Sequence, residues 1–295
     1  MSAPVLVGTS SWSERTLVHD SGWYPKRTMK AAERIAYYAA RFPLVEIDAT
    51  SRFPPTPDLA RQWVDRTPAG FTIDVQAWTL LCGGAALPDS LWEDLRHEVR
   101  PELRDRPRLY INHLSAAGRQ EAWARFRHAL APLVAAGRLG AVILRYPSWM
   151  RPGATGRALL AEARGELTEL PLAAELTHRR WLEGRECEAT LEHLEEQHMG
   201  FVCVDPREGP PVLASTSDLA FVRFPGRNPG NWVEPDLDIG ERYAYRYSRD
   251  ELRAWVKPIC ELASAASAVH VLFSNCWRDD AVANAADLLG LLAAV

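Results

Sequence analysis

Residues 141–176 read AVILRYPSWMRPGATGRALLAEARGELTELPLAAEL, and this stretch contains one complete strand–helix–strand unit. Its two ends, residues 141–145 and 172–176, are short apolar runs with the length of a buried β-strand. A helix is predicted between them over residues 157–163. Because both strands are largely apolar on each face, they are typical of a parallel sheet that is covered by helices.

The same unit recurs along the chain. Further strands are predicted over residues 5–9, 44–48, 71–76, 201–205, 219–223 and 269–273. Apolar side chains at helical spacing follow most of them, as in the run Ile35, Tyr38, Ala39 and Phe42. The sequence therefore predicts an α/β protein with a single closed (β/α)8 barrel of the TIM type. The alternative is an open doubly wound sheet, but no G-x-G-x-x-G follows the first strand and no P-loop is present.

We expect one domain over residues 1–295, with residues 82–119 as an embellishment inserted between the third and fourth strands. The insertion is predicted to contain a helical run at residues 91–99 and a weak extra strand at residues 109–111.

Three predicted helices have recognisable starts or apolar faces. A helix that begins at Thr56-Pro57 is expected to bury Leu59 and Trp63. Ser248 and Glu251 form the pattern of a capping box at the start of a later helix. A further helix, which follows the insertion, has the apolar stripe Trp123, Phe126, Leu130 and Val134.

The composition is that of an ordinary globular protein, with 47% hydrophobic and 24% charged residues among 295. Lysine and arginine number 34 and aspartate and glutamate 38, so the net charge is −4, which disfavours avid sequence-independent nucleic-acid binding. The five cysteines form no CxxC pair and no zinc-type spacing, as expected for reduced thiols in a cytoplasmic protein. The apolar run at residues 5–7 is too short for a signal peptide, and no stretch approaches a membrane span.

Several short segments resemble, in order, the YecE-like family, also called domain of unknown function 72. They are GTSSWS at residues 8–13, WYP at 23–25, FPLVEI at 42–47, RTPAGF at 66–71, and Ala174-Glu175 with His178 and Trp181. The resemblance covers nearly the whole chain and implies a (β/α) barrel, but no established reaction. The chain departs from the family pattern at four strand ends, where it has Asp48, Gln76, Arg145 and Thr177 in place of asparagine, lysine, glutamine and arginine.

Charged side chains lie at the predicted carboxyl ends of the strands, where ligands bind in such barrels. Glu46 or Asp48 is the candidate general base and Glu175 its partner, while Arg145 and Arg223 are candidates to hold an anionic group. The alternative is a closed ionic network of the same glutamates and arginines that fills the barrel.

Polar and aromatic side chains at the same ends are candidates for substrate binding. They are Ser10, Trp12, Gln76, Trp78, His178, Trp181 and Asn275. Trp12, Trp78 and Trp181 are the candidate stacking platforms, and Trp149 and Trp232 belong to the same tryptophan-rich rim. The alternative is that these indoles pack the long loops together.

Evidence for a metal or phosphate site is weaker. Asp48, Glu175, His178 and Asp205 are ligand types, but a single strand-end histidine is a poor metal signal, so no metal or other cofactor is assigned. The loop at residues 223–231 offers glycine amides and two arginines to a phosphate, or is an ordinary surface turn.

The favoured function is therefore binding or transformation of a polar ring-containing ligand, such as a sugar, sugar phosphate or nucleotide. If the protein is an enzyme, carboxylate acid/base chemistry suits a hydrolase or isomerase. The alternative is a catalytically silent protein that binds single-stranded nucleic acid, a metabolite or a protein partner; a membrane is not expected as a partner.

Overall fold

Eight parallel strands form a closed barrel in the order β1 to β8, as the sequence predicts. The computed structural model describes residues 3–228 and 241–294. The strands are β1 Val5–Ser10, β2 Leu44–Ile47, β3 Thr72–Gln76, β4 Leu139–Tyr146, β5 Leu172–Leu176, β6 Met199–Val204, β7 Leu219–Phe224 and β8 Ala268–Phe273. The predicted and observed strands differ by two residues or fewer at either end.

Helices alternate with these strands. They are α1 Arg15–His19, α2 Ala31–Ala39, α3 Pro57–Asp65, α4 Ala116–Ala135, α5 Ala154–Glu166, α6 Arg185–Glu196, α7 Arg249–Ala265 and α8 Asp280–Leu292. The described residues group into two compact units. The first holds the chain up to Glu46, residues 65–73 and the chain from Gly200; the second holds Ile47–Val64 and Asp74–Met199.

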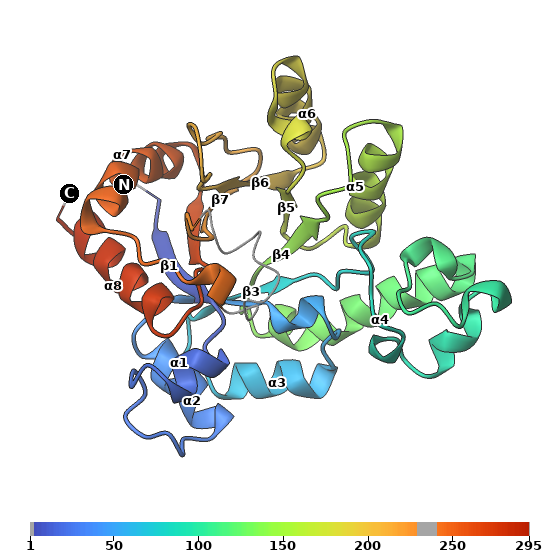
Figure 1. Ribbon diagram of the computed structural model, residues 1–295, viewed down its shortest axis with the longest axis horizontal. Coiled ribbons are helices and arrows are strands. Elements are labelled where there is room, and N and C mark those ends of the chain that lie inside the picture. The colour runs from blue at the N-terminus through green and yellow to red at the C-terminus, as the bar shows by residue number, and fades with distance from the viewer. Residues whose placement is uncertain (1–2, 229–240, 295) are drawn as a thin grey trace. The chain divides into compact units, whose positions relative to one another are not determined.

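In the first unit, β1 pairs with both β2 and β8, and the C-terminal helix α8 packs beside β1 (Figure 1). The Tyr38 hydroxyl of α2 accepts a hydrogen bond from the Thr9 amide at 2.8 Å and donates one to the Leu44 carbonyl at 2.9 Å. Thr9 therefore faces the helices. Because side chains alternate along a strand, Ser10 and its register partner Glu46 face the opposite side, the barrel interior.

Helix α7 begins with the predicted capping box. The Ser248 hydroxyl accepts from the Glu251 amide at 3.3 Å, and the Glu251 carboxylate accepts from the Ser248 amide at 2.8 Å. Tyr245 donates a further hydrogen bond to the same carboxylate at 2.6 Å. Burial opposes the charge of Glu251, but these hydrogen bonds and nearby Arg227 outweigh it and hold its pKa below the usual 4.5.

This capping box makes stability depend on pH. Because the folded-state pKa of Glu251 is lowered, its charged form stabilises the fold above about pH 4.5, and that contribution is lost as the pH falls through the folded-state pKa. We expect Glu251→Gln to lower the free energy of unfolding by about 1 kcal/mol at pH 7, and by less at pH 3.5. Urea titrations at both pH values check this. Glu261→Gln, an exposed control on α7, should change the free energy of unfolding little. Equal losses of stability at both pH values for Glu251→Gln would contradict the prediction.

In the second unit, α3 and α4 bury the apolar residues that the sequence predicts, with one exception in each helix. Trp63 is buried, but Leu59 is 39% exposed and Val134 is 47% exposed, so these two predictions are wrong. A helix turns about 100° per residue. The buried stripes run through Ala60 in α3 and Leu133 in α4 instead, which rotates Leu59 and Val134 out of contact.

The insertion in the second unit contains less regular structure than predicted. The expected helix over residues 91–99 is only the short 3₁₀ helix η3, Asp94–Glu98. The expected strand over residues 109–111 is a single antiparallel bridge between Leu109 and Ala86. η3 ends where Val99 adopts extended backbone, and Arg100, which precedes Pro101, does not resume the helix.

Candidate functional site

A buried ion pair lies inside the first unit. Arg223 at the end of β7 donates two parallel hydrogen bonds to the Glu46 carboxylate, at 2.7 and 2.8 Å. Ser10 accepts from the same guanidinium at 2.9 Å and donates to Glu46. Glu46 is 0% exposed and Arg223 6% exposed. The sequence allowed either a ligand site or a closed ionic network for these charged residues, and the network describes this trio. The contact joins β1, β2 and β7 and is buried away from solvent.

A second ion pair, in the second unit, has one partner exposed to solvent and one partner buried. Arg145 of β4 and Glu175 of β5 are register partners, and the Arg145 Nε lies 2.9 Å from the Glu175 Oε1. The Glu175 side chain is 3% exposed, whereas that of Arg145 is 44% exposed. The strand neighbours Leu144 and Tyr146 are buried. This pair thus places a positively charged donor at the carboxyl ends of two strands, with its counter-charge below the surface.

Three predicted site residues of the second unit make backbone or side-chain hydrogen bonds near the strand ends. The Asp48 carbonyl accepts from the Ser51 amide at the start of η1, Ala49–Ser51. The Gln76 carbonyl accepts from the Thr50 hydroxyl at 2.6 Å. His178 precedes η6, Arg179–Leu182, and its Nδ1 accepts from a backbone amide at 3.2 Å. All three side chains are half-buried.

The tryptophans of the predicted rim differ in exposure. Trp78 and Trp181 are 0% exposed. Trp181 also donates its indole hydrogen to the Met150 carbonyl at 2.8 Å. Both indoles therefore fit the alternative in which the tryptophans pack the loops. Trp12 is also buried, at 9% exposed. Trp149, in contrast, is 55% exposed. Trp232 lies outside the described residues.

Asp205, a candidate metal or acid/base residue in the sequence, is a buried anchor in the first unit. Its carboxylate accepts hydrogen bonds from Arg227 at 2.6 and 2.8 Å, from Tyr247 at 2.8 Å and from the Trp255 indole at 3.1 Å. These partners are 22, 42 and 50 residues away, so no local spacing could have identified them. Burial and the neighbouring Asp205 raise the pKa of Tyr247 well above its usual value.

Two more predictions from the sequence concern the first unit. Asn275 donates from Nδ2 to the Tyr245 carbonyl at 2.7 Å and to Asn284 at 3.0 Å, which ties the end of β8 to α8. In the loop at residues 223–231, which could bind a phosphate, the Arg227 side chain forms an ion pair with Asp205. Residues 229–231 of that loop lie outside the described residues.

No group of three or more histidine, cysteine, aspartate or glutamate residues within the described chain is placed to hold a metal ion. Among the same residues, no helix is long and apolar enough to cross a membrane.

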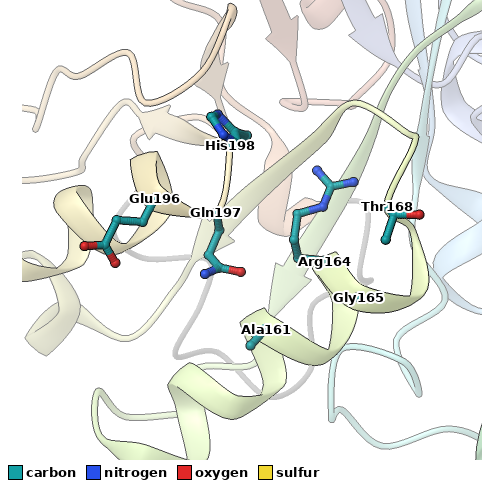
Figure 2. Close-up of a pocket in the computed structure, with 7 residues that line it drawn as sticks. All are labelled: Ala161, Arg164, Gly165, Thr168, Glu196, Gln197 and His198. Atoms are coloured by element: carbon teal, nitrogen blue, oxygen red, sulfur yellow. The ribbon is translucent and has the colours of Figure 1, made fainter.

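One cavity lies away from the strand ends considered above. It has a volume of about 370 Å³ and is formed by the last turns of α5 and α6 with the residues that follow them (Figure 2). Within it, Arg164 donates a hydrogen bond to the Leu170 carbonyl at 3.0 Å. Because Thr168 and His198 precede β5 and β6, the cavity is at the amino ends of these strands, which in such barrels contribute to stability rather than to ligand binding.

Comparison with known proteins places the chain in a family. A model described as "Protein of unknown function DUF72" matches residues 6–295. The chain belongs to the DUF72 family. This DUF72 protein is 28% identical over 297 residues to the UPF0759 protein YunF of Bacillus subtilis, covering 98% of the chain and 94% of that relative.

Solved DUF72 structures share the fold. A DUF72 protein from Enterococcus faecalis superposes with a TM-score of 0.76 at 23% identity, covering 98% of this chain and 95% of the other. One from Thermotoga maritima superposes with a TM-score of 0.74 at 23% identity, covering 98% and 99%. At 23% sequence identity, this structural similarity establishes the barrel fold alone. A ligand has to be inferred from the residues of this chain.

Proposed function

We propose that this DUF72 protein binds a polar ring-containing small molecule with an anionic group, such as a sugar phosphate or a nucleotide, at the carboxyl ends of β4 and β5. The observation that carries this proposal is the exposure of Arg145. Its side chain is 44% exposed at the end of a buried strand, over a glutamate that is 3% exposed.

The chemistry of the pair suits an anionic ligand. A guanidinium offers five N–H donors in a fixed plane and binds phosphate or carboxylate groups through two parallel hydrogen bonds. The contact between the Arg145 Nε and Glu175 fixes the orientation of that plane before the ligand arrives. The carboxyl end of a barrel strand is also where the ligands of this architecture bind.

Glu175 gives the site a second capability. A carboxylate held beside a bound ring can take up or deliver a proton, which is the step that isomerases and hydrolases of sugars require. Glu175 is the candidate for this role in the second unit, since Gln76 has no carboxyl group and Asp48 is half-buried at the start of η1.

Calorimetric titration tests the proposal with ribose 5-phosphate, glucose 6-phosphate and AMP, and with ribose as the uncharged control. We expect a phosphorylated ligand to bind and ribose to bind at least tenfold more weakly, because a charge-assisted contact contributes about 1.5–3 kcal/mol. Arg145→Gln should remove the difference. Arg127→Gln, which removes the same charge from an exposed position on α4, should retain it. Failure of all three phosphates to bind, or unchanged binding by Arg145→Gln, would overturn the proposal.

A further inference from the structure

A cluster of exposed arginines occupies the insertion of the second unit. Arg100, Arg104, Arg106 and Arg108 fall within nine residues, and all four are exposed. None of them forms an ion pair with a carboxylate anywhere in the residues that the structure describes. Arg100 and Arg104 donate hydrogen bonds to backbone carbonyls only, at 2.9–3.1 Å. The cluster therefore keeps its positive charge on a protein whose net charge is −4.

A row of rings lies next to these arginines. The Tyr110 ring meets the Trp149 ring edge-on, with centroids 6.4 Å apart, and meets the His113 ring at 5.3 Å. The Arg100 amide donates a hydrogen bond to the His113 carbonyl at 3.0 Å, and Arg108 precedes Tyr110 by two residues, so the arginines lie close to the row. Burial, together with Arg100 and Arg106, also lowers the pKa of His113. At the other end of the row, Trp149 is 55% exposed.

We propose that this surface, defined as the four arginines with Tyr110 and Trp149, binds single-stranded nucleic acid. Guanidinium groups bind the phosphates of the strand, and an exposed aromatic face stacks on its bases, which are no longer covered by a paired strand. Binding of a single strand uses both kinds of group together, and the two are adjacent here.

Other anionic partners fit the surface less well. An acidic peptide would use the arginines but has no flat ring to stack on Trp149. An anionic membrane would also attract the arginines, but it has no flat base to stack on Trp149. The surface uses neither Arg145 nor Glu175, so this inference stands apart from the small-molecule site.

Fluorescence anisotropy with a labelled 12-nucleotide oligo-dT tests the inference on the full chain. We expect binding that weakens steeply with salt. Arg106→Gln/Arg108→Gln should reduce the slope of log affinity against log salt by about 1.4, because each phosphate contact contributes about 0.7. Trp149→Ala should weaken binding roughly 5- to 100-fold through loss of one stacked base, and Trp149→Phe should restore part of it.

Charge-matched controls keep the test specific. Arg61→Gln/Arg253→Gln removes two exposed arginines elsewhere and should leave the affinity unchanged. Equal binding by the Arg106→Gln/Arg108→Gln variant and this control would overturn the inference. So would equal competition by poly-glutamate, tighter binding to phosphatidylserine vesicles than to the oligonucleotide, or an affinity that does not depend on salt.

Discussion

Replacing Glu46 with glutamine is expected to lower the free energy of unfolding by about 3–5 kcal/mol, which is among the largest effects of a single substitution in this chain. The reason is the environment of Arg223. This guanidinium is 6% exposed and donates two hydrogen bonds to a carboxylate that is 0% exposed. Without the carboxylate, this buried guanidinium loses two charge-assisted hydrogen bonds and the negative charge of Glu46.

A double replacement separates the charge effect from packing. Glu46→Leu/Arg223→Met removes both charges and fills the space with apolar atoms, so we expect it to be close to the wild type in stability. Urea unfolding, followed by circular dichroism with a check that the slope m stays constant, measures both variants. A loss under 1 kcal/mol for Glu46→Gln, or a double variant less stable than the single one, would contradict the prediction.

Replacing Asp205 with alanine is expected to cost about 2–5 kcal/mol, because two buried donors, the Tyr247 hydroxyl and the Trp255 indole, lose their acceptor. Arg227 contributes less to this cost, since its side chain is 32% exposed and water can replace the carboxylate.

Asp205→Asn is the conservative comparison. It keeps a side-chain oxygen for one donor, so we expect a smaller loss of stability than with alanine. Arg227→Gln, which leaves Tyr247 and Trp255 bonded, should cost least. Thermal unfolding by calorimetry ranks the three variants, and an Arg227→Gln loss as large as that of Asp205→Ala would show that the charge pair, not the buried donors, is decisive.

The strands were predictable because a barrel strand is buried on both faces and leaves an apolar run in the sequence. The β5 prediction, residues 172–176, has the observed bounds. The alternative of an ionic network of glutamates and arginines inside the barrel also describes Glu46, which Arg223 binds. The helix faces were harder to predict, since an error of one residue turns a side chain by about 100°, as at Leu59 and Val134.

The partners of the charged residues were only partly predictable. Arg223 follows Glu46 by 177 residues, and the sequence offered two arginines and two glutamates with no spacing to pair them. The closed barrel resolves the choice by register, which sets Arg145 beside Glu175. Arg145 is exposed whereas Arg223 is buried. This difference could not be predicted, because the loops that follow the strands carry no periodic pattern in the sequence.

The most direct test of ligand binding at β4 and β5 is a crystal structure with the sugar phosphate that binds most tightly in the titrations. We expect phosphate oxygens about 2.8 Å from the Arg145 guanidinium nitrogens, the distance of a charge-assisted hydrogen bond, with Glu175 still holding Nε. A phosphate bound elsewhere on the chain, with no contact to Arg145, would contradict the proposed site.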